Sequence, residues 1–257
     1  MTNANPVELV VVPCLRDNYA FLVHNPATGE TALVDAPEAA PIRAALDQRG
    51  WTLTDLLITH HHDDHIAGVA ELRGNARVVG AAADAHRLPP LDLAVGEGDT
   101  LTVAGQTTQV FDVSGHTIGH IAFHMPDAAL AFTADSLMAM GCGRLFEGTP
   151  AQMWHSLLKL RALPDETLIC SGHEYTEANM RFALTLEPDD AALISRSKAI
   201  VAARAAGQFT VPSTLAEEKR TNPFLRADLP QLKAALGMSD ASATDVFAEV
   251  RGRKDRF

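Results

Sequence analysis

The chain has 257 residues, of which 47% are hydrophobic and 21% charged, the composition of a globular domain with a large apolar core. Its formal net charge is −11, from 21 basic and 32 acidic residues, which argues against general affinity for nucleic acid. No apolar run approaches the roughly 18 residues needed to span a membrane, and residues 1–7 lack the basic and hydrophobic segments of a secretory signal. Three widely spaced cysteines fit reduced thiols in a cytoplasm and exclude a disulfide framework.

Strands and helices alternate over the first two thirds of the sequence, which favours the α/β class. Strands are predicted at 8–12, 19–23, 31–34, 53–58, 77–80 and 167–170, with hairpins at 100–103/107–113 and 120–125/129–133. Helices are predicted at 38–48 and 150–163, and a short helix is predicted after the segment 59–65, ending at residue 72. Residues 89–99 are predicted to be loop.

Strand signals disappear after Tyr175, and segments rich in Ala, Leu, Lys and Glu follow. Helices are predicted there at 176–186, 189–206, 228–236 and 240–251. We therefore expect two domains, a mixed α/β domain over 1–174 and an all-helical domain over 175–257.

The sequence Thr-His-His-His-Asp-Asp-His at 59–65 follows the end of a predicted buried strand and precedes a predicted helix. It offers His60, His62, Asp64 and His65 as metal ligands within six residues. Imidazole and carboxylate are ligands that suit zinc, iron or manganese. A solvated polar loop is the alternative, but a turn between strand and helix is a common place for a metal site.

Three later strands also end close to a residue that can bind a metal. These residues are His116 after 110–113, Asp135 after 129–132 and His173 after 167–170. The carboxyl ends of several strands commonly supply the active-site residues of α/β proteins. Alone, each residue is more simply read as a core, turn or capping residue. Gly115 before His116 permits a tight turn, and His120 is expected to pack against the site or contact a ligand ring.

Seven candidate ligands exceed the needs of one tetrahedral zinc, which takes three protein ligands and a water in a catalytic site. They suit two metals, with Asp135 able to bridge them, three histidines completing one site, and Asp64 with two histidines completing the other. Such a pair supplies hydroxide at neutral pH and hydrolyses a carbonyl or phosphoryl bond.

The His-x-His-x-Asp-His loop, Ser-Gly-His116, Thr-Ala-Asp135 and Ser-Gly-His173 together resemble the metallo-β-lactamase superfamily. Segments 141–148, 173–176, 221–226 and 251–255 narrow the resemblance to the glyoxalase II (hydroxyacylglutathione hydrolase) family. The resemblance implies a four-layered αβ/βα sandwich with a C-terminal all-helical domain. It also implies hydrolysis of S-(2-hydroxyacyl)glutathione thioesters, S-lactoylglutathione giving lactate and glutathione, in methylglyoxal detoxification.

Carried over residue by residue, the resemblance assigns His60, His62 and His116 to a first metal and Asp64, His65 and His173 to a second. Asp135 is shared by the two metals. The resemblance also assigns the catalytic role to two carboxylates, those of Asp64 and Asp135. Two divalent ions per chain are expected, zinc first, with iron or manganese as alternatives. The resemblance assigns substrate binding to Arg144, Phe146, Tyr175, Arg251 and Lys254. We expect a cytoplasmic monomer that binds neither nucleic acid nor a membrane.

The chemistry of the basic candidates agrees with this assignment. Glutathione carries two carboxylates, which suit Arg forks and a Lys point charge. Arg251 and Lys254 are three residues apart on a predicted helix and can share one face, although a solvated basic tail would have the same sequence. Arg144 lies in a Gly-rich loop, and the Tyr175 hydroxyl either donates to the ligand or the ring simply packs.

The sequence departs from the family pattern at three places. Phe146 stands where the family often has Tyr, so a hydroxyl contact is expected to be missing. Asp63 adds an acid between ligands, which points either to solvent or to a His ring. Segment 34–38 differs from the usual Asp-Pro-Gly, so its loop shape is left open.

Three other functions are alternatives to the thioester hydrolase. A persulfide dioxygenase of the same superfamily would hold one iron, and it usually lacks the C-terminal helices. A nuclease on this fold would need a basic surface, which the net charge of −11 argues against. A purely structural metal module would not need seven ligands.

Overall fold

The computed structural model describes residues 7–257, so most of the segment used to exclude a secretory signal, residues 1–6, lies outside the described range. The chain divides into two compact units. The first unit runs to residue 112 and resumes over 118–133, and the second comprises 113–117 and 134–257. The units are therefore interleaved in sequence, with 113–117 separated from the rest of its unit.

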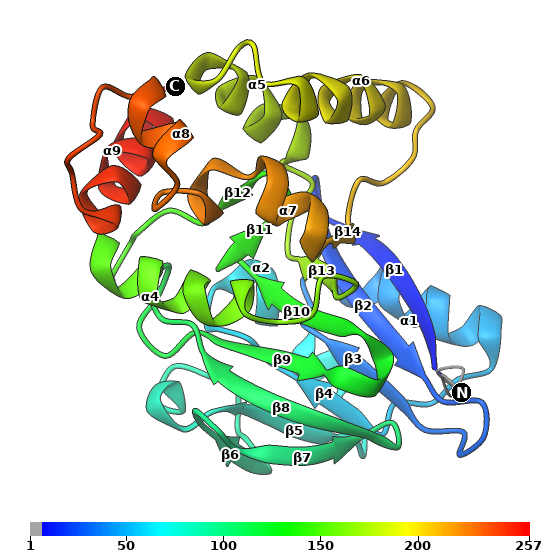
Figure 1. Ribbon diagram of the computed structural model, residues 1–257. Helices are drawn as coiled ribbons and strands as arrows, with labels where there is room; N and C mark the ends of the chain where they lie inside the picture. Colours follow the sequence, from blue (N-terminus) through cyan, green and yellow to red (C-terminus); the bar gives the residue numbers. More distant parts are fainter. Residues whose placement is uncertain (1–6) are drawn as a thin grey trace. The chain divides into compact units, whose positions relative to one another are not determined.

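A six-stranded sheet lies in the first unit (Figure 1). Its strands, in spatial order, are β1 (Glu8–Cys14), β2 (Asn18–His24), β3 (Thr31–Val34), β4 (Asp55–Leu57), β5 (Arg77–Ala81) and β6 (Leu93–Val95). β1 to β3 are antiparallel neighbours, whereas β3 to β6 are parallel. The central strands β3 and β4 are buried along their whole length, which agrees with the apolar residues that follow Thr31 in β3 and Asp55 in β4.

The prediction of loop over 89–99 was wrong at strand β6. Leu93 pairs with Val79 of β5 in parallel register, at the edge of the sheet. The strand has three residues, of which only Val95 is buried, so its sequence carries almost none of the apolar periodicity that identifies a strand.

The predicted helices of this unit are confirmed. α1 (Ala39–Arg49) buries Ile42 and Leu46, one turn apart, and ends at Gly50, which has the left-handed conformation favoured by glycine after a helix. The helical segment up to Leu72 consists of two single turns, α2 (Asp63–Ile66) and α3 (Val69–Leu72). They are separated at Gly68, where a Cβ atom would lie 3.0 Å from the Ala39 nitrogen.

The two predicted hairpins are also confirmed. They form an antiparallel run of β7 (Thr100–Val103), β8 (Gln106–Asp112), β9 (Ile121–Met125) and β10 (Leu130–Ala134). Ala104 and Gly105 both have positive φ, as two-residue hairpin turns that match strand twist require. The rings of Phe21 in β2 and Phe132 in β10 are 5.7 Å apart, so the core lies between the two sets of strands.

The second unit is predominantly helical (Figure 1). Its short strands are β11 (Leu137–Met138), β12 (Gly141–Cys142), β13 (Leu168–Ser171) and β14 (Ser213–Thr214). Its helices are α4 (Pro150–Arg161), α5 (Thr176–Leu186), α6 (Ala191–Ala205), α7 (Leu215–Thr221), α8 (Pro230–Ala235) and α9 (Ala243–Arg256). α5 and α6 lie side by side and share a core of Met140, Met180, Ala183, Leu193 and Ile200.

One strand and one α-helix after residue 175 were not predicted. β14 pairs with β13, Ser213 opposite Ile169, and contradicts the expectation that no strand follows Tyr175. α7 begins with a capping box in which Thr214 and Glu217 each bind the other's backbone N–H. The Thr-x-x-Glu spacing is the sequence signal that would have located this helix.

Among residues 7–257, the longest helix is α6, with 15 residues. None of the helices in this range combines the length and the apolar character needed to cross a membrane.

Candidate metal centre

The histidine-rich loop follows β4 and leads into α2, as the sequence predicted. Thr59 anchors the start of the loop, because its N–H donates to the Asp35 carboxylate (2.9 Å) and its carbonyl accepts from Ile121 N–H. His60 is fully buried, and its Nε2 lies 3.1 Å from Nδ1 of His62. The two rings therefore present nitrogen atoms to one point.

α2 presents the next two candidates, Asp64 and His65. His65 is fully buried, and its Nδ1 is 2.8 Å from Oδ2 of Asp35. This hydrogen bond leaves Nε2 as the ring atom available to a metal. Nε2 lies 3.9 Å from Oδ2 of Asp64, whose side chain also accepts a hydrogen bond from the Asn18 amide (3.0 Å).

Asp35 was not identified from the sequence as part of the site. It stands just after β3 with a φ of 55°, a left-handed conformation that is uncommon for a residue with a side chain and is frequent at functional sites. Its two carboxylate oxygens accept from Thr59 N–H, the Thr59 hydroxyl and the His65 ring. Asp35, His60 and His65 have nitrogen and oxygen atoms within 4.8 Å of one another, the spacing of a possible metal site. Because both oxygens of Asp35 accept hydrogen bonds, we interpret Asp35 as a residue that orients the ligand His65 and not as a metal ligand itself. Its position at the carboxyl end of a strand was the available signal.

Further polar residues surround this loop. His61 binds the fully buried carboxylate of Asp84 through a 2.9 Å contact. The ring of His120 stacks on that of His60 with centroids 4.6 Å apart, which agrees with the packing role expected for His120. Asp63 is exposed, so it points to solvent and does not contact a His ring.

The second unit brings together its own three candidates. Oδ2 of Asp135 lies 3.4 Å from Nε2 of His116 and 3.3 Å from Nε2 of His173, and all three side chains are buried. Ligand atoms about 2.0–2.1 Å from a tetrahedral metal are about 3.3 Å apart. One carboxylate oxygen thus stands at ligand spacing from both imidazoles. Asp135 follows Ala134, which has a left-handed φ of 40°.

Backbone contacts orient His116. Its Nδ1 lies 2.8 Å from the carbonyl oxygen of Arg144, so Nδ1 carries the proton and donates, and Nε2 faces Asp135. Gly143 passes so close that a Cβ atom there would overlap the Asp135 carbonyl and lie 2.8 Å from Nδ1 of His116. A Cβ on Gly115 would lie 2.7 Å from that of Met153, so the predicted need for glycine before His116 is confirmed.

Each unit supplies donor atoms of the kinds that bind a divalent metal. The first unit supplies the pairs His60/His62 and Asp64/His65, and the second supplies His116, Asp135 and His173. Buried imidazoles with one nitrogen held by a carboxylate or carbonyl, and the other directed to a common point, are typical of zinc, iron and manganese sites.

The two basic candidates of α9 are anchored within the second unit. Arg251 is buried and donates to the Cys142 carbonyl (2.9 Å) and to Oδ1 of Asp255 (2.8 Å). Lys254 donates to the Ala178 carbonyl (3.3 Å). Neither belongs to the freely solvated tail that the sequence alone also allowed.

Lys254 is set between two aromatic rings, with Nζ 5.4 Å from the centroid of Phe182 and 5.1 Å from that of Phe257. Partial burial, followed by repulsion from Arg251 and other arginines, lowers the pKa of Lys254 to about 8. The ammonium group therefore titrates close to physiological pH.

The other three substrate-binding candidates are more accessible. The Arg144 side chain is 66% exposed, with Nε 4.0 Å from Asp255. Phe146 is 63% exposed, and its ring lies edge-on, 5.2 Å from the ring of His116. The Tyr175 ring stacks on that of His173 at 4.7 Å with the planes nearly parallel, and the residue is 39% exposed.

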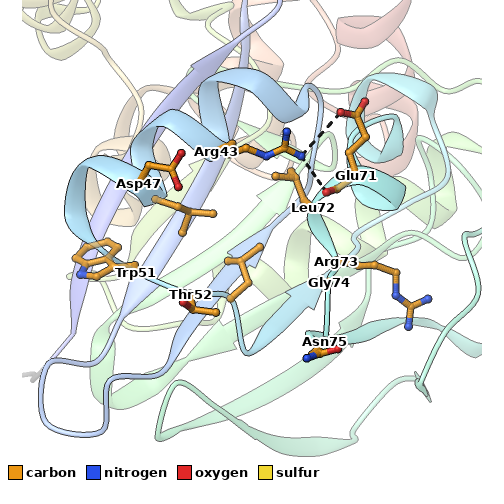
Figure 2. Close-up of a pocket in the computed structure, with 11 residues that line it drawn as sticks. Arg43, Asp47, Trp51, Thr52, Glu71, Leu72, Arg73, Gly74 and Asn75 are labelled. Carbon is orange, nitrogen blue, oxygen red and sulfur yellow. Dashed lines mark hydrogen bonds and ion pairs between the residues drawn. The ribbon is translucent and has the colours of Figure 1, made fainter.

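A separate surface pocket lies beside α1 in the first unit (Figure 2). Arg43, Asp47, Trp51 and Glu71 contribute to its walls, and Arg43 donates to the Glu71 carbonyl at 3.0 Å. None of the candidate metal ligands named above lines this pocket.

Comparison with known proteins supports one family along the whole chain. Residues 15–173 match the metallo-β-lactamase superfamily, and residues 174–257 match the C-terminal region of hydroxyacylglutathione hydrolases. The chain is 65% identical to a hydroxyacylglutathione hydrolase of Cereibacter sphaeroides (strain ATCC 17025 / ATH 2.4.3) and 62% identical to one of Ruegeria pomeroyi. Each alignment covers 98% of this chain and 100% of the relative.

Solved structures show the same fold. The BLEG-1 B3 metallo-β-lactamase superposes with a TM-score of 0.66 at 21% identity, covering 85% of this chain and 99% of its own. ETHE1 from Myxococcus xanthus superposes with a TM-score of 0.64 at 25% identity, covering 96% and 89%. The predicted metallo-β-lactamase fold with a helical C-terminal region is confirmed, and the chain belongs to the hydroxyacylglutathione hydrolase family of the metallo-β-lactamase superfamily.

Proposed function

We propose that this protein hydrolyses S-(2-hydroxyacyl)glutathione thioesters, converting S-lactoylglutathione to lactate and glutathione in methylglyoxal detoxification. The observation that carries the proposal is the match of residues 174–257 to the C-terminal region of hydroxyacylglutathione hydrolases. This region contains three of the residues assigned to substrate, Tyr175, Arg251 and Lys254. Identity of 65% over 98% of the chain to a relative of that name supports the same reaction.

The proposed metal centre contains two divalent ions. His60, His62 and His116 hold the first, Asp64, His65 and His173 hold the second, and Asp135 is common to both. The position of Asp135 Oδ2, at 3.4 Å from His116 and 3.3 Å from His173, supports the shared role. Zinc is the proposed metal, with iron and manganese as alternatives of the same ligand chemistry.

When bound, the metal pair supplies hydroxide at neutral pH and polarises the thioester carbonyl. The protein contributes the geometry of its ligands: Asp35 fixes the His65 ring, and the Arg144 carbonyl fixes that of His116. The departing thiol has a pKa of about 8.5, far below that of an amine or alcohol. The leaving group therefore departs as a thiolate, and no general acid is required of the chain.

Substrate binding is assigned to the second unit. Arg144, Arg251 and Lys254 provide positive charge for the two glutathione carboxylates, and the Tyr175 hydroxyl provides a donor. Phe146, exposed beside His116, provides an apolar surface without the hydroxyl that the family often has. We assign residues 1–174 to a catalytic domain and 175–257 to a substrate-binding domain, in a cytoplasmic monomer with three reduced, buried cysteines.

The persulfide dioxygenase alternative is not favoured. The helices α5 to α9, with their match to hydroxyacylglutathione hydrolases, form the region that those dioxygenases usually lack.

Turnover of S-lactoylglutathione by the purified protein, followed by metal analysis of the same sample, tests the proposal. Thioester hydrolysis with two metal ions per chain is expected. One iron per chain, with oxygen uptake on glutathione persulfide and no thioester hydrolysis, would refute it.

A further inference from the structure

Side chains from the C-terminal helical region bind the backbone of the hairpin β11–β12. The Met140 N–H at its turn donates to Oε2 of Glu218 (2.8 Å), and the Asn222 amide donates to the carbonyls of Met138 (3.1 Å) and Gly141 (3.0 Å). Figure 1 shows the hairpin beside α7, which carries Glu218 and ends at Thr221.

Two more helices bind the same hairpin. The Asn179 amide on α5 donates to the Ala139 carbonyl (3.1 Å), and Arg251 on α9 donates to the Cys142 carbonyl (2.9 Å). Four carbonyls and one N–H of residues 138–142 are therefore satisfied by side chains more than 35 residues away in sequence. We call Glu218 and Asn222, which contribute three of these five contacts, the hairpin clamp.

The clamp is fully buried, and both carboxylate oxygens of Glu218 accept hydrogen bonds. Oε2 of Glu218 also accepts from the Asn222 amide (3.0 Å), while Oε1 accepts from Ser213 (2.7 Å) and from Arg196. Both oxygens thus accept hydrogen bonds only. A glutamine at this position would turn an NH2 group toward other donors in either orientation.

The far end of the hairpin reaches the candidate metal ligands. Gly143 follows β12, packs against the Asp135 carbonyl and leads to Arg144. The Arg144 carbonyl then accepts from Nδ1 of His116, which sets the nitrogen facing Asp135. A continuous path of backbone and hydrogen bonds therefore runs from Asn222 and Glu218 to His116.

We propose that Glu218 and Asn222 are positioning residues for the metal centre, acting through hairpin β11–β12 and the Arg144 carbonyl on the orientation of His116. The C-terminal helical region then has a second task besides binding substrate. The inference rests on the proposed metal centre, but it concerns metal binding and does not depend on which thioester is hydrolysed.

The variants Asn222→Ala and Glu218→Gln test this inference, with Glu217→Gln as the matched control. Glu217 is the exposed neighbour of Glu218 on α7, and its capping box accepts glutamine in place of glutamate. The affinity for Zn2+ is measured by chelator competition, and the visible spectrum of the Co2+-loaded protein reports ligand geometry. Both measurements are made without substrate.

A positioning role predicts that each clamp variant loses about 10- to 100-fold in metal affinity or in kcat, with an altered Co2+ spectrum. KM should change by no more than about threefold, and Glu217→Gln should match the wild type. A lowered melting temperature with wild-type metal affinity, Co2+ spectrum and kcat would mean that the clamp only stabilises the fold, and the inference would be wrong. Loss of metal affinity in a protein whose wild type does not cleave S-lactoylglutathione would uphold the inference and refute the proposed function.

A measurement on the wild type covers the case in which the clamp variants fail to fold. Nitrogen-15 NMR of the histidine rings in the zinc-loaded protein should show His116 with the proton on Nδ1 and the metal on Nε2. Zinc on Nδ1 of His116 would break the path through the Arg144 carbonyl and overturn the inference.

Discussion

The imidazole of His65 and the carboxylate of Asp35 are joined by a 2.8 Å hydrogen bond between Nδ1 and Oδ2, with both side chains buried. Asp35 also accepts from the N–H and the hydroxyl of Thr59. One carboxylate thus fixes a proposed ligand and the start of the loop that carries His60. Asp35 therefore holds the histidine-rich loop in position at Thr59 and at His65.

Asp35→Asn should lower metal affinity by about 10- to 100-fold, the usual cost of losing a partner of a metal ligand. An amide cannot accept at both of its ends, so either Thr59 or His65 loses its acceptor. Chelator competition with Zn2+ measures the effect, and Asp47→Asn on the exposed side of α1 is the control. Equal affinities for the two variants would show that Asp35 does not position His65.

Asp135→Ala should remove most of the bound metal and nearly all turnover. This side chain lies near both His116 and His173, and its loss leaves two imidazoles without the shared anion. Metal content after dialysis and thioester turnover are the measurements. Asp127→Ala, in the exposed turn between β9 and β10, should retain both. Full metal content in Asp135→Ala would contradict the bridging role.

Lys254 should make substrate binding sensitive to alkaline pH. Its pKa is lowered to about 8, mainly by burial, so the charge available to a substrate carboxylate is lost as pH rises through about 8. We therefore expect kcat/KM to fall above pH 8 in the wild type, because this ratio reports ionisations of the free enzyme.

Lys254→Arg should remove that step in the pH profile, since a guanidinium stays charged. Lys254→Ala should raise KM by at least about tenfold with little change in kcat, as loss of ground-state binding requires. Lys198→Ala, on the exposed face of α6, is the control. An unchanged alkaline step in Lys254→Arg would assign the ionisation to another group.

Phe146→Tyr should lower KM for the glutathione thioester by several-fold. The ring is exposed beside His116, so an added hydroxyl can reach a bound ligand without displacing core atoms. A new hydrogen bond to a neutral partner contributes about 0.5–1.5 kcal/mol. Steady-state kinetics measure it, with Phe209→Tyr at another exposed position as control. A KM equal to that of the wild type would place the substrate peptide out of reach of residue 146.

Breaking the buried ion pair between Arg226 and Glu187 should strongly destabilise the helical region. Both side chains are buried, and Nη2 of Arg226 donates to Oε1 of Glu187 at 3.1 Å in addition to a second, shorter contact. Glu187→Gln leaves a buried guanidinium without its counter-charge and should cost about 3–5 kcal/mol. Urea unfolding measures this loss, and Glu249→Gln, in an exposed pair with Arg253, should leave the free energy of unfolding almost unchanged. If both variants lost a similar free energy of unfolding, burial of the Arg226–Glu187 pair would not be the cause of the loss.

The sequence by itself determined most of the elements and the chemistry of the site. Apolar periodicity and turn residues located the buried strands and most helices, because such elements repeat along the chain. The spacing of His60, His62, Asp64 and His65 indicated a metal site, since local order places these residues in one loop and one helical turn.

Only the tertiary structure decided what holds those ligands in place. Asp35 precedes His65 by 30 residues, and Asn222 follows the hairpin it binds by more than 80. Neither contact produces a pattern in the nearby sequence from which it could be predicted. The three-residue strand β6 is too short to show the apolar periodicity of a strand. A ligand type is a property of one residue, whereas its orientation depends on hydrogen-bond partners that meet only when distant segments fold together.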